Sequence, residues 1–467
     1  MANLTYENRI GVADNTPAGF SIADFQYLVP TLETPTKAVG DYRALGLPSI
    51  ADEFYGTDFR YDSAGVPIGG TVTEYRELRD GEMLLSLRDV AVPVTALVRW
   101  SATGDDLGAA TAIFAGNDAI RGASGGDTLR GYGGNDTING DGGDDTLRGD
   151  AGNDTLIGGP GSNVLSGGDG YDTAVVPTVL RQAALSVSGG SGTVAGAGFQ
   201  DSLSSVEAIR FIDGTMSYDA GFGAAQVLRL YQAALGRAPD AGGLAFWSDA
   251  LQNGASPRAL AASFLGGPEF QSRFPDAQQN ADGFVRQLYQ NVLGRAPDAG
   301  GQTYWSGLLT SGRADQADVL AAFAESAENK TTTEQRTAGG VWVPDQQAAQ
   351  TARMYYATLG RAPDAGGLSF WTNNLENGAT LLHQARAFTE SGEFQAKYGS
   401  LSNSEFVNTT YANVLGRPAD AGGQAYWTNM LDGGGATRAE VVVGFSESRE
   451  HQLKLAPVIE AGGIVVG

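Results

Sequence analysis

The sequence predicts a multidomain chain of the β plus α class, because two internal repeats of different kinds divide its 467 residues. A glycine- and aspartate-rich repeat with a period of nine fills residues 111–176 and predicts a stack of short strands. A longer repeat, with alanine, leucine and aromatic residues at helical spacing, fills residues 222–454. We therefore expect an N-terminal β-rich domain over 1–110, a parallel β-roll, a β-rich cap over 177–221, a C-terminal all-α repeat domain and a tail over 455–467.

The N-terminal region contains one clear hairpin pattern. Apolar and polar residues alternate on both sides of the sequence DSAG at residues 62–65, and residues 83–100 predict a strand followed by a helix. Several carboxylates of this region are candidates for the acid–base pair of a glycosidase, but nothing in the sequence singles out two of them. We expect them to be solvated surface groups: Asp24, Asp52, Glu53, Asp58 and Glu74.

The nonapeptide register runs through seven copies in phase. An acidic or amide residue recurs every nine positions, and a glycine lies two residues before each one. An aliphatic residue lies two positions after each and is expected to point inward: Ile120, Leu129, Ile138, Leu147, Leu156, Leu165 and the smaller Ala174. The expected metal ligands are Gly116, Asp118, Gly125, Asp127, Gly134, Asp136, Gly143, Asp145, Gly152, Asp154, Asn163 and Asp172.

The spacing suits calcium, which takes six to eight oxygen ligands from carboxylates and backbone carbonyls. Residues 114–176 hold ten aspartates, no glutamate and three arginines, a net charge of −7 that repels itself in any compact metal-free state. We expect a segment that is unfolded without calcium and folds when calcium fills about five sites, each between a turn and the turn two repeats later. Asp136 lies in a central nonapeptide, one rung of the expected stack, and would be shared by two ions. The alternative interpretation of residues 111–176 is a disordered glycine-rich linker.

This nonapeptide array resembles the RTX (repeats-in-toxin) family, whose hemolysin-type repeats form a calcium-binding β-roll. The resemblance implies a secreted protein of a Gram-negative bacterium that leaves through type I secretion machinery, guided by an uncleaved C-terminal signal. The tail LAPVIEAGGIVVG is similar to such a signal, and residues 198–219 are similar to the strand–turn–strand segment that closes RTX rolls. The N-terminal sequence is not a Sec-type signal peptide, and no run of 18 apolar residues predicts a membrane span.

The helical repeat occurs four times. Each copy carries a tyrosine, the motif LGR, an aspartate followed by AGG (in three copies as PDAGG) and an aromatic–tryptophan pair, beginning at Tyr231, Tyr289, Tyr355 and Tyr411. We expect the glycine of LGR to end one helix and the aspartate to cap the next: Asp240, Asp298, Asp364 and Asp420. The pattern resembles a helical repeat family of unassigned function found in bacterial secreted RTX and surface proteins. The DAGG loops invite a second interpretation as calcium or glycan sites, but capping and core packing explain them better.

Composition excludes several functions. The net charge of −23 argues against nucleic acid and anionic membranes as partners, and the lack of cysteine excludes disulfides and thiolate metal sites. There is no HExxH zinc motif, and the two histidines are His383 and His451. The sequence GASGG at residues 122–126 matches the GxSxG motif of serine hydrolases, but it lies inside the nonapeptide register rather than at a turn between a strand and a helix.

We therefore expect no enzyme. The favoured function is an extracellular or cell-surface calcium-binding protein with a structural, adhesive or self-assembling role. The alternatives are a cell-surface polysaccharide-binding module and a carbohydrate-active enzyme with an N-terminal site.

Overall fold

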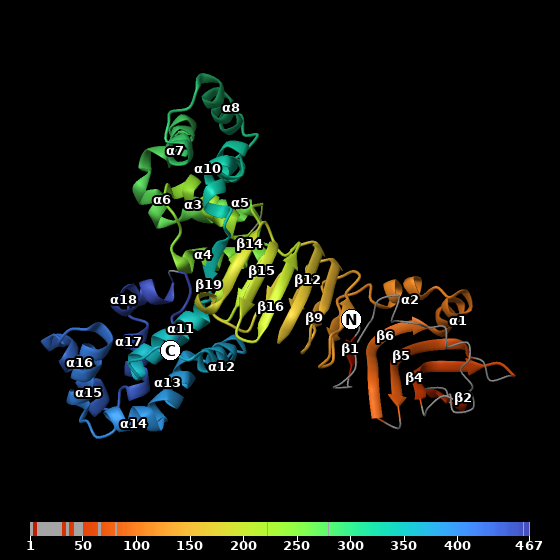
Figure 1. Ribbon diagram of the computed structural model, residues 1–467. Helices are drawn as coiled ribbons and strands as arrows, with labels where there is room; N and C mark the ends of the chain where they lie inside the picture. The colour runs from red at the N-terminus through yellow and green to blue at the C-terminus, as the bar shows by residue number, and fades with distance from the viewer. Residues whose placement is uncertain are drawn as a thin grey trace. The chain divides into compact units, whose positions relative to one another are not determined.

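The computed structural model describes residues 3–6, 30–33, 37–41, 50–63, 67–79, 82–221, 223–278, 280–460 and 462–466. The chain divides into two compact units (Figure 1). One unit comprises Met1–Pro177 and Ala183–Arg210, and the other comprises Thr178–Gln182 and Phe211–Gly467. The first is rich in strands and the second is mostly helical, as the repeat patterns predict.

The N-terminal part of the first unit is an antiparallel sheet with strand order β1-β6-β5-β4-β3-β2. The expected hairpin is confirmed, since β4 pairs with β5 around the predicted turn, and so is the strand followed by a helix. Two helices follow β6, and apolar residues of β6 and of the first helix, such as Val92 and Trp100, are buried. The elements are β1 (Asn3–Tyr6), β2 (Pro30–Glu33), β3 (Lys37–Asp41), β4 (Ile50–Tyr61), β5 (Pro67–Arg79), β6 (Glu82–Pro93), α1 (Val94–Thr103) and α2 (Asp106–Ile113).

The nonapeptide segment forms a parallel roll with two faces. Strands of alternate nonapeptides share a face, so that one coil of the roll takes two nonapeptides and residue i pairs with residue i+18. The aliphatic residue of every copy points inward, and Leu129, Ile138, Leu147, Leu156 and Leu165 are fully buried. One face holds β7 (Ala119–Arg121), β9 (Thr137–Asn139), β11 (Thr155–Ile157) and β13 (Thr173–Val175), and the other holds β8 (Thr128–Arg130), β10 (Thr146–Ala151) and β12 (Gly161–Asp169).

Other strands continue the roll on one face at its first coil and on both faces at its last coil. At the first coil, β1 pairs in parallel with β7 and antiparallel with β6, which joins the roll to the N-terminal sheet. At the last coil, β16 continues one face beside β12 and β17 continues the other beside β13. Residues 198–219 hold three strands where the sequence predicts two, because a further turn separates β17 from β18. The cap consists of β14 (Ala184–Ser188), β15 (Ser191–Gly196), β16 (Phe199–Ser204) and β17 (Ala208–Phe211).

The second unit contains the four helical repeats, each built from four helices. Between the second and third repeats, β19 (Val341–Pro344) pairs antiparallel with β18 (Gly214–Ser217). The helices are α3 (Ala224–Leu235), α4 (Ala241–Gln252), α5 (Pro257–Gly266), α6 (Pro268–Arg273), α7 (Ala281–Leu293), α8 (Ala299–Thr310), α9 (Gln316–Ala324), α10 (Ala327–Thr337), α11 (Gln346–Thr358), α12 (Ala365–Glu376), α13 (Leu381–Glu390), α14 (Gly392–Tyr398), α15 (Asn403–Thr410), α16 (Ala421–Asp432), α17 (Arg438–Ser446) and α18 (Arg449–Ile459), with a π-helical turn at Tyr411–Leu415 after α15.

The expected caps of the LGR and DAGG motifs are confirmed. Gly236 ends α3 in the left-handed conformation with φ of 63°, and the Asp240 carboxylate accepts the backbone N–H of Gly243 at the start of α4. The second and fourth repeats show the same two caps. In the third repeat Asp364 caps α12 in the same way, but Leu359 is the C-cap of α11, and Gly360 follows it in the left-handed conformation with φ of 68°. The LGR arginine lies over the repeat's tyrosine ring and forms an ion pair with a glutamate of the repeat's last helix, as Arg237 does with Glu269.

The second glycine of DAGG is required by packing. A Cβ added at Gly243 would lie 2.1 Å from the Tyr231 hydroxyl oxygen, and the other three repeats show the same contact. The first glycine is not required, because a Cβ at Gly242 would meet nothing closer than 3.7 Å. The tyrosine and the tryptophan both pack against one phenylalanine, with ring centroids 4.7 Å and 5.3 Å from Phe264 in the first repeat.

Gly243→Ala should destabilise the helical unit, because the added methyl group displaces the buried Tyr231. We expect a loss of about 1–3 kcal/mol in the free energy of unfolding, measured from the helical circular dichroism signal on heating the full chain. Gly242→Ala is the matched control and should be neutral or stabilising. Equal melting of the two variants would show that the tyrosine contact does not constrain this position.

Candidate metal centre

The acidic or amide residue that recurs every nine positions, here called the marker residue, occurs seven times. The structure places these seven residues in two columns, one along each side of the roll. Successive members of a column are 18 residues apart, and all seven side chains are buried. One column contains Asp118, Asp136, Asp154 and Asp172, and the other contains Asp127, Asp145 and Asn163.

Hydrogen bonds link the members of each column in a regular ladder. The backbone N–H of Asp118 donates to Oδ1 of Asp136 at 2.8 Å, and the N–H of Asp136 donates to Oδ1 of Asp154 at the same distance. The same bond recurs from Asp127 to Asp145, from Asp145 to Asn163 and from Asp154 to Asp172. Each carboxylate is therefore held in one orientation, with Oδ1 engaged and Oδ2 turned to the other side.

The second oxygen of these carboxylates has a different environment. A carboxylate oxygen buried without a donor costs several kcal/mol unless a proton or a cation compensates it. In the described part of the roll, Oδ2 is shielded from solvent and accepts no hydrogen bond from the protein at Asp136, Asp145, Asp154 and Asp172.

A glycine five residues before each of these aspartates, the first glycine of its nonapeptide, forms a cradle beside this oxygen. A Cβ added at Gly131 would lie 2.2 Å from Oδ2 of Asp136 and 2.8 Å from the carbonyl oxygen of Gly149, two nonapeptides further on. Gly140 and Gly149 stand in the same relation to Asp145 and Asp154. Only glycine leaves this space open, and the oxygens that border it are of the hard type that calcium prefers.

The predicted glycine ligands have another role in the geometry. Gly134, Gly143 and Gly152 adopt φ between 118° and 132°, a region that side chains disfavour. A Cβ at Gly152 would also lie 1.8 Å from the carbonyl oxygen of Gly134. In the same way, the carbonyl groups of Gly116 and Gly125 lie against Gly134 and Gly143, each 18 residues later. Any metal contact of these residues would therefore be made by the backbone.

Comparison with known protein families agrees with this geometry. A model of the RTX calcium-binding nonapeptide repeat matches residues 114–147 and 139–174. The chain contains RTX calcium-binding repeats. A second model, of the domain of unknown function DUF4214, matches residues 223–274, 261–333 and 385–455 of the helical unit. Neither family is an enzymatic one. No curated protein matches the chain.

The RTX roll contains a second ladder that sequence reasoning missed. Its members directly precede the marker residues, and each side-chain oxygen accepts the N–H of the residue 18 positions later. Asn117 accepts from Asn135 and Asn135 from Asn153, each at 2.8 Å, and Asn153 accepts from Tyr171 at 2.9 Å. The sequence contains a signal for this ladder, because asparagine or aspartate directly precedes several of the marker residues.

Sequence reasoning also missed two residues of the cap. The N–H of Asp172 donates to Glu207, and the side-chain amide of Asn163 donates to Oδ1 of Asp201, both at 2.8 Å. Glu207 and Asp201 thus continue the two columns with residues outside the nonapeptide register. No periodic signal in the sequence marks them.

Burial raises the pKa of the rung carboxylates, and neighbouring carboxylates add to the effect. The pKa of Asp136 and of Asp172 rises to about 7, and that of Asp145 to about 6. The pKa of Asp154 is raised by the same causes. Within the described residues, no three carboxylate or imidazole side chains gather around one point, so a cation in the RTX roll would be held largely by backbone carbonyls.

Two of the N-terminal carboxylates are not the solvated groups that the sequence predicts, because ion pairs hold them partly buried. Glu53 is bonded to Lys37 and Tyr55, and Glu74 pairs with Arg76 and Arg88. Of the remaining N-terminal carboxylates, Asp58 lies in β4 with φ of 55°, Asp52 is described only as backbone of β4, and Asp24 lies outside the described residues.

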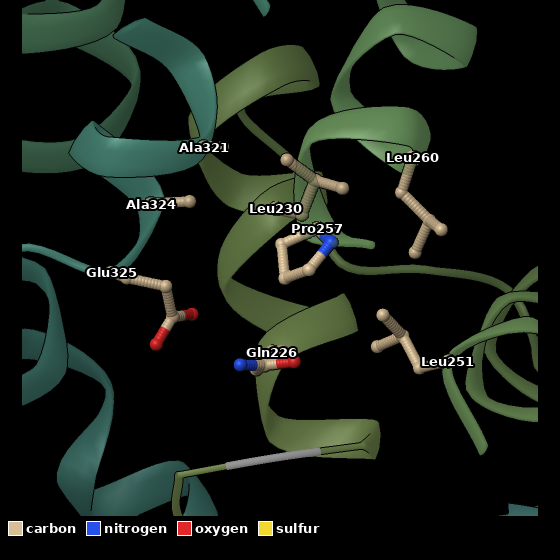
Figure 2. Close-up of a pocket in the computed structure, with 8 residues that line it drawn as sticks. All are labelled: Gln226, Leu230, Leu251, Pro257, Leu260, Ala321, Ala324 and Glu325. Carbon is tan, nitrogen blue, oxygen red and sulfur yellow. The ribbon is translucent and has the colours of Figure 1, made fainter. Parts of the chain in front are cut away.

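Neither His451 nor a small pocket of the described helical unit has room for a ligand larger than water. His451 is buried against the carbonyl of Ser446. A small pocket in the first two repeats is lined by apolar residues with Gln226 and Glu325, and its cavity of about 10 Å³ admits a single water molecule (Figure 2). No described helix is long and apolar enough to cross a membrane.

Asn163→Asp should create an additional calcium site. Oδ1 of Asn163 accepts from Asp145, which leaves the amide nitrogen near Gly158, where the other rungs place Oδ2. An N–H group repels a cation, and a carboxylate would restore the ligand. We expect a stoichiometry raised by about one ion in calorimetric calcium titration. An unchanged stoichiometry would contradict this role of the Asn163 amide.

The metal-free RTX roll should be stabilised by acid. The folded-state pKa values of about 7 for Asp136 and Asp172 exceed the ordinary value of 3.8, so the folded chain binds more protons than the unfolded chain between these limits. Its free energy of unfolding therefore rises as the pH falls through 7 and declines as the pH rises again. Circular dichroism of the full chain in chelator should show more β signal at about pH 5 than at pH 8. A loss of signal on acidification would contradict the burial of these carboxylates.

Proposed function

We propose that the protein is a secreted calcium-binding RTX protein that folds on calcium outside the cell and acts as a structural, adhesive or self-assembling surface or matrix protein. The observation that carries the proposal is the set of buried Oδ2 atoms in the roll, each beside a glycine cradle. Where calcium is scarce, the uncompensated charge disfavours the stacked roll and leaves an extended segment suited to a type I secretion channel. Bound calcium supplies the positive charge that the folded roll requires.

In this proposal the rung aspartates and the carbonyl groups of the glycine turns hold about five ions, each between turns two nonapeptides apart. The Oδ1 ladder orients each carboxylate before the ion arrives, so that little side-chain entropy is lost on binding. The column that contains Asn163 should bind more weakly at its end, because the amide replaces a carboxylate oxygen. No catalytic step is assigned to the chain.

The helical repeats supply the interaction surface in this account. They are held by caps, ion pairs and aromatic packing that involve no metal, so they can fold before or after the roll. Self-association is one use of four similar repeats, and attachment to a surface polysaccharide is the other.

Asp136→Ala tests the calcium sites of the full chain. Asp136 is a central rung, and its loss should weaken two ions and raise the calcium concentration at the folding midpoint several-fold from about 0.1–1 mM. Asp169→Asn is the matched control, since Asp169 is an exposed aspartate of the same roll outside both columns. Circular dichroism and calorimetry with calcium measure the effect.

Equal responses of the two variants would refute these sites. Sedimentation velocity of the unsubstituted chain, with and without calcium, tests self-assembly. A monomer under both conditions would exclude self-assembly as the function.

A further inference from the structure

One aromatic residue in each helical repeat is exposed although it has no packing role. The four rings are Phe246, Tyr304, Phe370 and Tyr426, and they are 56–63 % exposed. They occupy the same position in α4, α8, α12 and α16, directly before the repeat's tryptophan. The tyrosine, the tryptophan, the LGR arginine, the N-cap aspartate and the second glycine of the motif all make structural contacts, whereas the exposed ring recurs without burial.

The exposed rings are held in fixed orientations. Phe246 meets Trp247 edge to face, with ring centroids 4.8 Å apart and an interplanar angle of 79°. The three other pairs lie at 5.0–5.1 Å and 75–81°. Each tryptophan is fixed in turn by the buried phenylalanine of its repeat, as Trp247 is by Phe264. A ring fixed in this way can bind a ligand with little loss of rotamer entropy.

The first glycine of DAGG lies one helical turn before each ring. Side chains of a helix lean toward its N-terminus, so the residue four positions earlier is the neighbour of the ring on the helix surface. Those neighbours are Gly242, Gly300, Gly366 and Gly422, all exposed. Nothing in the packing requires glycine there, because an added Cβ would meet no atom closer than 3.3 Å. The bare backbone leaves the flank of each ring open.

The helices that carry the rings also carry exposed polar groups. The N-cap aspartates of three of these helices are about two-thirds exposed, and each lies 3.6–3.8 Å from the LGR arginine: Asp240, Asp298 and Asp420. One turn after the rings, the exposed residues are Asp249, Gly307, Asn373 and Asn429. A flat ring with carboxylate or amide groups on the same helix matches the two sides of a neutral sugar, whose C–H face stacks on an aromatic ring and whose hydroxyl groups donate hydrogen bonds.

We propose that these four ring-and-glycine sites bind a neutral polysaccharide, one sugar ring at each site. Each site presents a single exposed ring rather than a contiguous apolar patch of several hundred Å², the feature that marks a protein interface. The exposed aspartates and the net charge of −23 disfavour an anionic polymer. Weak sites on one chain gain strength when one polymer occupies several of them. This inference selects the polysaccharide use of the repeats within the proposed function, but its sites do not depend on calcium.

Affinity electrophoresis of the calcium-loaded full chain tests the proposal, in gels that contain dextran, mixed-linkage β-glucan or galactomannan. At least one polymer should retard the chain. The single variant Tyr304→Ala should lower the affinity about 3- to 10-fold, and alanine at all four ring positions should abolish retardation. Leu453→Ala is the control, since Leu453 is an equally exposed apolar residue of α18 outside these sites.

A second variant blocks the rings without removing them. Glutamine at Gly242, Gly300, Gly366 and Gly422 places a side chain beside each ring and should weaken retardation while the helical signal is retained. No retardation in any of the three polymers, or full retardation of the four-alanine variant, would overturn the proposal. Loss of self-association in the four-alanine variant, with no polymer bound by the unsubstituted chain, would assign the rings to contacts between copies instead. Calcium-induced β signal, measured in the same samples, reports separately on the roll.

Discussion

A carboxylate oxygen buried beside a glycine backbone is the interaction on which the roll depends. Each rung aspartate uses Oδ1 to join its own turn to the preceding turn of the same column, and this bond directs Oδ2 into the cradle of the first glycine. The apolar contribution is small, because each nonapeptide buries one aliphatic side chain worth about 1.5–3 kcal/mol. Ordering nine residues costs on the order of 10 kcal/mol, so hydrogen bonds and ion binding must decide whether the roll forms.

The helical unit is stabilised in a different way. Its repeats bury aromatic clusters, cap both ends of the helix–loop–helix segment and pair the LGR arginine with a glutamate about 32 residues later. Two further arginines, Arg229 and Arg353, are buried and bonded to Glu325 and Glu447, which ties the first repeat to the second and the third to the fourth. Removing one partner of such a pair leaves an unpaired buried charge and costs about 3–5 kcal/mol. None of these contacts includes a residue of the two aspartate columns, so in the proposed function calcium is required by the roll and not by the helical unit.

Much of this architecture could be predicted from the sequence, because both repeats have a fixed period. The inward aliphatic residues, the pairing of turns 18 residues apart and the DAGG caps follow directly from spacing. The carboxylates Asp201 and Glu207 could not be predicted, since they reach the columns from the cap through strand pairing that has no period. The contact between Gly243 and Tyr231 also joins positions that only the helix packing brings together. The sequence shows that Asn163 replaces the aspartate of the other copies, but the hydrogen bonds and the contact with Gly158 were needed to show that its amide nitrogen faces the cradle.

Hydrogen exchange of the full chain, followed by mass spectrometry in calcium and in chelator, shows whether the roll needs a cation to fold. Peptides of residues 114–176 should be protected in calcium and should exchange within seconds in chelator at neutral pH. Peptides of the four helical repeats should be protected equally under both conditions. Protection of the roll that is the same in chelator would contradict the claim that its buried carboxylates require a cation to fold.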